Sequence, residues 1–165
     1  MFTISDICNI AIQIERNGEK TYRAASKRTD NAQLAKVLQW MADEEERHAQ
    51  WFKALDAESK TLTGRREEIE TMGRSLLQEM MKGQTFSLDD DRLLATRDIL
   101  DLLSQSVDFE RDTILFYEML QSFIDDEETL VHLNNVIAEE RGHVVQLQRL
   151  QSSYQGRGGI DSVHP

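Results

Sequence analysis

The chain has 165 residues and a formal net charge of -11, from 30 acidic and 19 basic residues. This length suits one domain, and the acidic balance argues against a nucleic-acid surface, which needs clustered Lys and Arg. Cys8 is the only cysteine, which excludes an internal disulfide and a Cys-x-x-Cys site. No apolar run approaches the roughly 20 residues that span a bilayer, and the N-terminal segment does not resemble a secretory signal. We therefore expect a cytoplasmic protein without membrane contact.

Four long helices are predicted, because the only proline is the last residue and strand-like alternation is scarce. The first is expected at about 5–27, and the turn at 29–31 caps a second at about 31–58. The third is expected at about 89–123, with Ser87 as its cap, and a turn at 125–126 precedes a fourth that ends at about 152. The expected units are a domain at 1–153, with hairpins at 4–58 and 88–153 and a connector containing a short helix at 59–86, and a mobile tail at 154–165.

Each helix carries residues in steps of three and four that form one inward-facing stripe, mostly apolar. A glutamate interrupts every stripe near its middle, and in two of them a histidine follows three residues later. These residues are Glu15, Glu45 with His48, Glu110, and Glu140 with His143. Any one of them alone is more often a surface or capping group, so it is the joint pattern that predicts inward side chains. Asp43, Glu44, Glu46 and Arg47 are left for the outside or the edge of the stripe.

The two halves of the chain match at an offset of 95 residues without a gap, which indicates an internal repeat. Glu15 and Glu45 are 30 residues apart with a turn midway, so each arm of about 15 residues rises about 22 Å and the carboxylates lie level. The second half repeats this spacing. Two hairpins packed face to face therefore place four glutamates and two histidines in one layer of an all-α four-helix bundle. The corresponding pairs are Glu15 and Glu110, Tyr22 and Tyr117, Glu45 and Glu140, and His48 and His143.

Four buried carboxylates need compensation, because desolvation costs each charge several kcal/mol. The stripes contain no Lys or Arg. Shared protons would neutralise some of the acids, whereas two divalent cations would balance all four. The Glu-x-x-His spacing lets one helix offer both side chains to one ion, as in di-iron and di-manganese bundles. Oxygen and imidazole ligands suit iron or manganese, and zinc is an alternative. The sequence thus predicts a dinuclear metal site.

With these features the sequence resembles the rubrerythrin-type branch of the ferritin-like superfamily. The motifs are "IERNGEKTY", "EEERHA", "DFERDTILFY" and "AEERGH", and the likeness covers nearly all of the chain outside 59–86 and the tail. The resemblance implies a ferritin-like antiparallel four-helix bundle that binds two iron ions. It implies terminal ligands at Glu15 and Glu110, bridging ligands at Glu45 and Glu140, and one histidine on each ion, His48 and His143. Tyr22 and Tyr117 resemble the family's outer-sphere tyrosines, with ordinary core aromatics as the alternative.

Several positions depart from the family pattern. Rubrerythrins often place an extra glutamate where this chain has Thr113, whose counterpart in the first half is Gly18. The ligand set is therefore symmetric and closer to that of bacterioferritin, and these two small residues predict room for a small oxidant. The sequence carries one cysteine and not the four of a rubredoxin domain, so we expect no such domain and an external electron donor. Glu46 stands where bacterioferritin has its haem methionine, so no haem is expected there.

The resemblance implies a di-iron oxidoreductase that reacts with hydrogen peroxide or oxygen, as a peroxidase or oxidase. Two alternatives stay open at this point. The first is ferritin-like ferroxidase activity with iron storage, and the second is a non-enzymatic role as a metal-dependent structural or sensor protein. A homodimer or a larger homo-oligomer is expected, and the long connector leaves open an exchange of hairpins between subunits.

Overall fold

The computed structural model describes residues 4–57, 71, 75, 99–122, 124 and 126–158. Within this part of the chain all regular structure is helical, which confirms the predicted all-α class. The long helices are α1 (Ile4–Arg28), α2 (Ala32–Ala57), α5 (Ile99–Gln121) and α6 (Glu127–Gly158). The bounds of α1 and α2 differ from the predicted ones by a single residue at each end.

Side-chain caps define the two tight turns where they were predicted. The Asn31 side-chain oxygen accepts hydrogen bonds from the backbone N–H groups of Gln33 and Leu34, at 3.0 Å each. The Asp126 carboxylate accepts one from the backbone N–H of Thr129 at 2.8 Å. Each cap satisfies N–H groups that the first turn of a helix leaves without a partner. The turns thereby fix where α2 and α6 begin.

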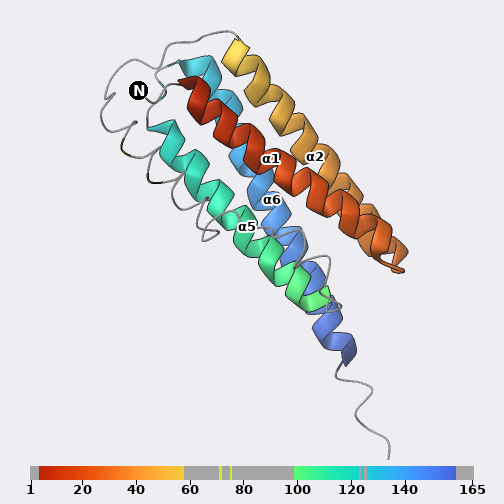
Figure 1. Ribbon diagram of the computed structural model, residues 1–165. Helices are drawn as coiled ribbons and strands as arrows, with labels where there is room; N and C mark the ends of the chain where they lie inside the picture. The colour runs from red at the N-terminus through yellow and green to blue at the C-terminus, as the bar shows by residue number, and fades with distance from the viewer. Residues whose placement is uncertain are drawn as a thin grey trace, which may run out of the picture.

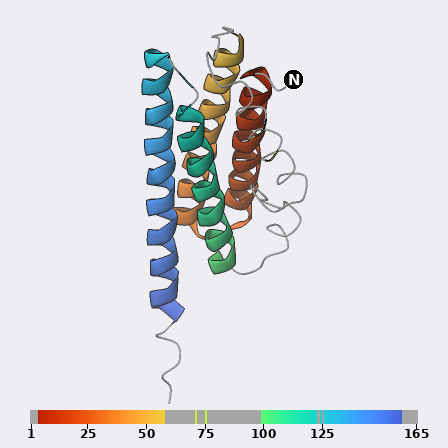
Figure 2. The same cartoon turned by 90° about the vertical axis from the view of Figure 1, so that its left-hand side faces the viewer.

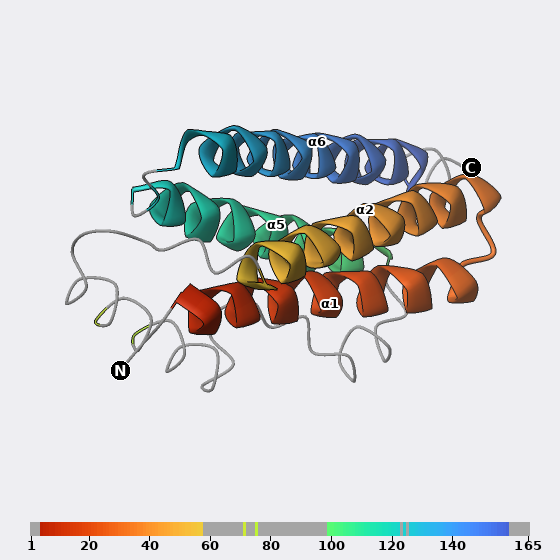
Figure 3. The ribbon, with the colours of Figure 1, turned by 90° about the horizontal axis from the view of Figure 1, so that it is seen from above.

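The four helices form two antiparallel pairs that pack against each other (Figure 1). The helices α1 and α2 make one pair and α5 and α6 the other, and α2 also contacts α6. Figures 2 and 3 show the two pairs facing each other across a shared interior. The end of α2 and the beginning of α5 lie at opposite ends of the bundle (Figure 1), so these two helices run in the same direction. This arrangement with one long crossover is that of the ferritin-like bundles.

Two predicted segments fall wholly or partly outside the described residues. In the connector, Thr71 and Ser75 are helical. The rest of 59–86, the predicted cap at Ser87 and the predicted helical residues 89–98 lie outside that description. Among the described residues, no helix is both long enough and apolar enough to cross a membrane.

The predicted end of the fourth helix is wrong. Helix α6 continues to Gly158, so 154–158 are helical and do not belong to a tail that begins at 154. Tyr154 lies four residues after Leu150 and packs against the same apolar cluster, so it continues the inward stripe into the last turns of the helix. In Figures 1 and 2 the end of α6 extends past the other helices.

The core consists of two apolar clusters with a polar layer between them. One cluster includes Ile14, Phe52 and Tyr117, and the other includes Tyr22 and Leu147. Along α2 the stripe passes from the second cluster through Glu45 and His48 into the first. The bundle therefore holds its polar layer at mid-length, sealed at both ends by apolar side chains.

Candidate metal centre

The structure brings all six predicted glutamates and histidines into one buried layer. Their exposed fractions are at most 2%. They form two groups in which one oxygen or nitrogen atom from each residue lies within 4.8 Å of the others. Both groups contain Glu45 and Glu140. The first group adds Glu15 and His48, and the second adds Glu110 and His143.

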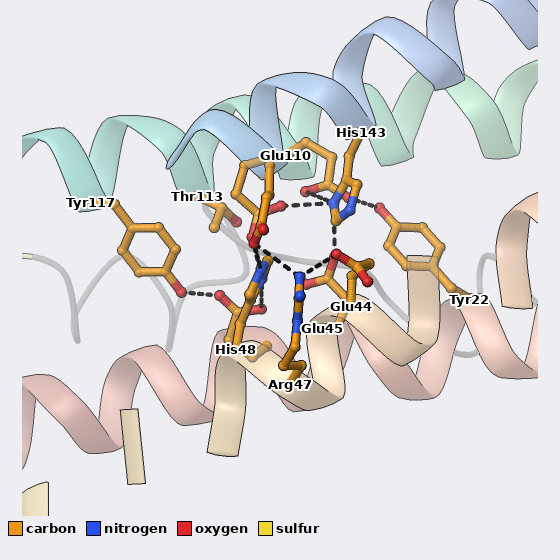
Figure 4. A network of polar contacts seen from close by, with 12 residues as sticks. Tyr22, Glu44, Glu45, Arg47, His48, Glu110, Thr113, Tyr117 and His143 are labelled. Carbon is orange, nitrogen blue, oxygen red and sulfur yellow. Dashed lines mark hydrogen bonds and ion pairs between the residues drawn. The ribbon is translucent and has the colours of Figure 1, made fainter. Parts of the chain in front are cut away.

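Helical spacing explains why these side chains converge while their neighbours do not. Glu45 and His48 lie one turn apart on the same face of α2, so both reach the interior. Asp43, Glu46 and Arg47 are exposed on the other faces of the same helix, and Glu44 is half-buried. This division confirms the predicted orientations of the charged side chains at 43–48. Figure 4 shows Glu45 and His48 reaching from one pair of helices toward Glu110 and His143 on the other.

The two histidines face carboxylate oxygens with the same ring nitrogen. The Nδ1 atom of His48 lies 2.8 Å from Glu140 Oε1 and 3.5 Å from Glu15 Oε2. The Nδ1 atom of His143 lies 2.8 Å from Glu140 Oε2 and 3.1 Å from Glu45 Oε1. Each Nδ1 atom is thus within ion-pair distance of two carboxylates that come from different helices. The ring nitrogens and the carboxylate oxygens therefore converge on one central region of the bundle.

This layer contains nearly all the orphaned polar atoms of the described core. Within the part of the chain that the structure describes, nine buried side-chain oxygen or nitrogen atoms of the six residues have no hydrogen-bond partner, and the one further such atom is the Tyr154 hydroxyl. Each buried polar group without a partner costs about 1–3 kcal/mol. Oxygen and imidazole atoms in this state form a donor set that fits iron or manganese ions. The donor atoms of this layer therefore suit the dinuclear metal site that the sequence predicts.

Two tyrosines each donate a hydrogen bond to a glutamate of the opposite hairpin. The Tyr22 hydroxyl on α1 donates a hydrogen bond to Glu110 Oε1 on α5, and the Tyr117 hydroxyl on α5 donates to Glu15 Oε1 on α1 (Figure 4). Both tyrosines are fully buried. In each glutamate the second oxygen has no hydrogen bond and belongs to the central layer. The tyrosines are core aromatics that also fix the orientation of two carboxylates.

Burial and mutual repulsion determine the protonation of the cluster without metal. Desolvation, together with the charge of Glu140, raises the pKa of Glu45 well above its ordinary value and that of Glu110 to about 7. Burial opposes the charging of His48, but the carboxylates of Glu140 and Glu15 prevail and raise its pKa to about 12. Burial also works against ionisation of Glu140, yet its contacts with His143 and His48 lower its pKa. Protons therefore take the place of cations in the metal-free layer.

Desolvation and nearby carboxylates also keep the tyrosines protonated. Burial and the charge of Glu110 raise the pKa of Tyr22 well above its usual range. Burial and the charge of Glu15 do the same for Tyr117. Each phenol therefore remains a hydrogen-bond donor at neutral pH.

The expectation of free room beside Gly18 is wrong. A Cβ atom at Gly18 would lie 3.0 Å from Glu45 Oε2 and 3.2 Å from Phe109 Cε1. The carboxylate of Glu45 thus fills the space that the absent side chain leaves. Thr113, its counterpart, is buried and donates its hydroxyl to the backbone oxygen of Phe109 at 3.0 Å. The glycine allows Glu45 to approach α1 closely.

The residues around His48 include one that the sequence analysis missed. Glu139 precedes Glu140 on α6, and its Oε2 lies 2.8 Å from His48 Nε2. Arg47 contacts the same oxygen at 3.0 Å and also pairs with Glu44. The available signal was the repeat, because Glu44 and Glu139 occupy equivalent positions, one residue before the inward glutamate of each motif.

Replacing Gly18 tests how tightly Glu45 is held, and Gly142 is a matched control within a helix. A Cβ at Gly142 would meet nothing within 4 Å. We expect Gly142→Ala to raise the free energy of unfolding by up to about 1 kcal/mol, as alanine does in a helix interior. Gly18→Ala should lose this gain, because overpacking against a buried side chain costs about 1–3 kcal/mol. Denaturant titration of both metal-free variants measures the difference, and equal gains would contradict the close approach.

The metal-free protein should become less stable as the pH rises from about 5 to 7.5. The folded protein keeps protons on Glu45 and Glu110 that the unfolded chain releases near the ordinary value of 4.5. The corresponding stabilisation is complete below pH 4.5 and, for Glu110, is lost as the pH rises through about 7. Denaturant titration of chelator-treated protein at several pH values measures this slope.

Glu45→Gln is the control for that slope. Glutamine does not titrate, so the variant should lose stability less steeply over the same range. An equal slope in both proteins would exclude Glu45 as a source of the effect and leave it to Glu110 and to repulsion among the surface charges of a chain with a net charge of -11.

Comparison with known proteins agrees with this geometry. The rubrerythrin family model matches residues 6–151. Among solved structures, the chain is similar to a protein from Thermotoga maritima that is provisionally described as ferritin-like and diiron-carboxylate. The TM-score is 0.70 at 21% sequence identity, over 92% of this chain and 96% of that chain, so this likeness shows the fold alone. No curated protein matches the sequence significantly. Because the family match extends over most of the chain and includes the whole buried layer, the protein belongs to the rubrerythrin family.

Proposed function

We propose that this protein is a non-haem di-iron oxidoreductase that reduces hydrogen peroxide or oxygen with electrons from a separate donor. One observation carries the proposal. Two groups of metal-ligating residues, each with a histidine, share Glu45 and Glu140 at the centre of the bundle. Shared carboxylates between two such groups are suited to two adjacent ions, and membership of the rubrerythrin family favours iron.

Each residue of the layer has a distinct role in this proposal. Glu15 and His48 would bind one ion, Glu110 and His143 would bind the other, and Glu45 and Glu140 would bridge them. Two divalent ions balance the four carboxylates, so the protons that compensate charge in the metal-free layer are released on binding. The ions would take the place of the missing partners of eight of the nine orphaned atoms, all except Nε2 of His143.

The tyrosines and the apolar clusters prepare the layer for binding. Tyr22 and Tyr117 each occupy one oxygen of a terminal glutamate and leave the other directed at the centre. A carboxylate held in this way loses little conformational freedom when it binds an ion. The apolar clusters on both sides exclude water, which strengthens the electrostatic interactions within the layer.

Burial restricts the reactant to a small molecule. All six proposed ligands are at most 2% exposed, so a bulky substrate cannot touch them in this conformation. Peroxide and oxygen are small enough to reach a buried layer through side-chain motion. A ferrous pair held here would supply the two electrons that, together with two protons from solvent, reduce one peroxide to two water molecules.

Stopped-flow mixing of the anaerobic ferrous protein with peroxide or with oxygen tests the proposal. We expect peroxide to oxidise the iron faster than oxygen does, as followed by the absorption of the ferric product. Glu46→Gln is a matched control, because Glu46 is an exposed neighbour of the layer. It should react like the unaltered protein, whereas Glu45→Gln should lose the rapid phase. If peroxide is no faster than oxygen, the assignment as a peroxidase is wrong.

The assembly size separates this proposal from iron storage. Storage of a mineral requires a closed shell of many subunits, whereas we propose a homodimer or another small homo-oligomer. Light scattering on the iron-loaded protein gives the mass directly. A mass of many subunits that enclose more than two irons per chain would favour the ferroxidase and storage function instead.

A further inference from the structure

The six proposed ligands are arranged symmetrically, but the residues that surround them are not. The ligands of the two halves correspond residue by residue, and so do Glu44 and Glu139. In a symmetric structure each of these two acids would serve the histidine of the opposite hairpin. The structure shows this contact on one side only. Glu139 on α6 lies 2.8 Å from Nε2 of His48 on α2.

No described residue makes an equivalent contact with His143, and its buried Nε2 atom has no hydrogen-bond partner among them. The Trp40 ring lies edge to face with His143 at a centroid distance of 5.3 Å. An aromatic face is at most a weak acceptor, so it does not replace a carboxylate.

Arg47 accounts for the position of Glu44, which is the counterpart of Glu139. Its guanidinium contacts both Glu44 on its own helix and Glu139 on α6. Both acids are therefore grouped at the His48 side, where Glu44, His48 and Glu139 lie within 4.8 Å of one another. The position of the repeat that corresponds to Arg47 is Gly142, which offers no cation to hold an acid beside His143. Figure 4 shows Arg47 and Glu44 beside His48.

We propose that the two metal positions are inequivalent, and that the position of His48 binds its ion more tightly than the position of His143. This inference rests on the proposed dinuclear site. Glu139 acts as a positioning residue, because a carboxylate that accepts the Nε2–H of a metal-bound histidine fixes its tautomer and increases its basicity at Nδ1. To bind a metal through Nδ1, His143 must carry its proton on Nε2. This buried N–H group has no acceptor among the described residues, and the cost of leaving it unpaired opposes binding.

Titration of metal-free protein with Co²⁺, followed by visible absorption and by calorimetry, tests this difference without any turnover. The unaltered protein should bind two ions per chain in separate steps. Glu139→Gln should weaken the tighter step by about 10–100-fold, the usual loss when such a partner is removed, so the two steps approach each other. Glu139 is half-exposed on its helix, and circular dichroism verifies that the variant folds.

Glu44→Gln is the matched control, since it removes an equal charge near the same histidine without removing its acceptor. It should change either step by no more than about threefold, the scale of a single exposed ion pair. The variants His143→Ala and His48→Ala provide independent evidence. The first should retain the tighter step, and the second should retain only the weaker one.

The outcomes separate this inference from the function on which it rests. Equal affinities for the two ions, or equal effects of Glu139→Gln and Glu44→Gln, would overturn the inequivalence and leave the dinuclear site intact. Fewer than two ions bound to the unaltered protein would overturn the dinuclear site itself.

Discussion

Four glutamates and two histidines are buried in the middle of an otherwise apolar bundle, and the rest of the structure accommodates this layer. Ionised carboxylates in such a place repel one another and lose their hydration, so the folded chain has to compensate them. Without metal it does so with protons, as the raised pKa values of Glu45 and His48 show. Two cations would provide the same compensation and would also satisfy atoms that have no other partner.

The fold meets this constraint by repetition. Two helical hairpins related by an offset of 95 residues each supply a lone glutamate and a Glu-x-x-His pair. The tyrosines then tie each hairpin to the outer carboxylate of the other, so α1 and α5 are linked through the layer itself. Gly18 lets Glu45 approach α1, and the apolar clusters seal the layer from both ends. At the proposed site the two halves differ in the residues around the ligands, where the first half has Arg47 and the second half has Gly142 at the equivalent position.

Much of this arrangement follows from residue spacing. The stripes in steps of three and four specify which side chains face inward, and two equal hairpins place the glutamates level. Contacts that depend on side-chain conformation could not be obtained in this way. The pairing of Glu139 with His48 depends on the rotamers of long side chains and on Arg47, which periodicity does not encode. The space beside Gly18 was predicted as free because spacing alone does not show that the Glu45 carboxylate turns into it. The extension of α6, by contrast, agrees with the spacing, because Tyr154 lies four residues after Leu150 and continues the inward stripe; the predicted helix ended one step too early.

If the proposed function is correct, the buried layer binds two metal ions between the hairpins. The most direct test is a crystal structure of the iron-loaded protein with anomalous diffraction measured at the iron absorption edge. Two anomalous peaks are expected in each chain, both between Glu45 and Glu140, one beside His48 and the other beside His143. Absence of peaks in the layer, or peaks confined to the surface beside Glu44 and Glu139, would contradict the proposed function.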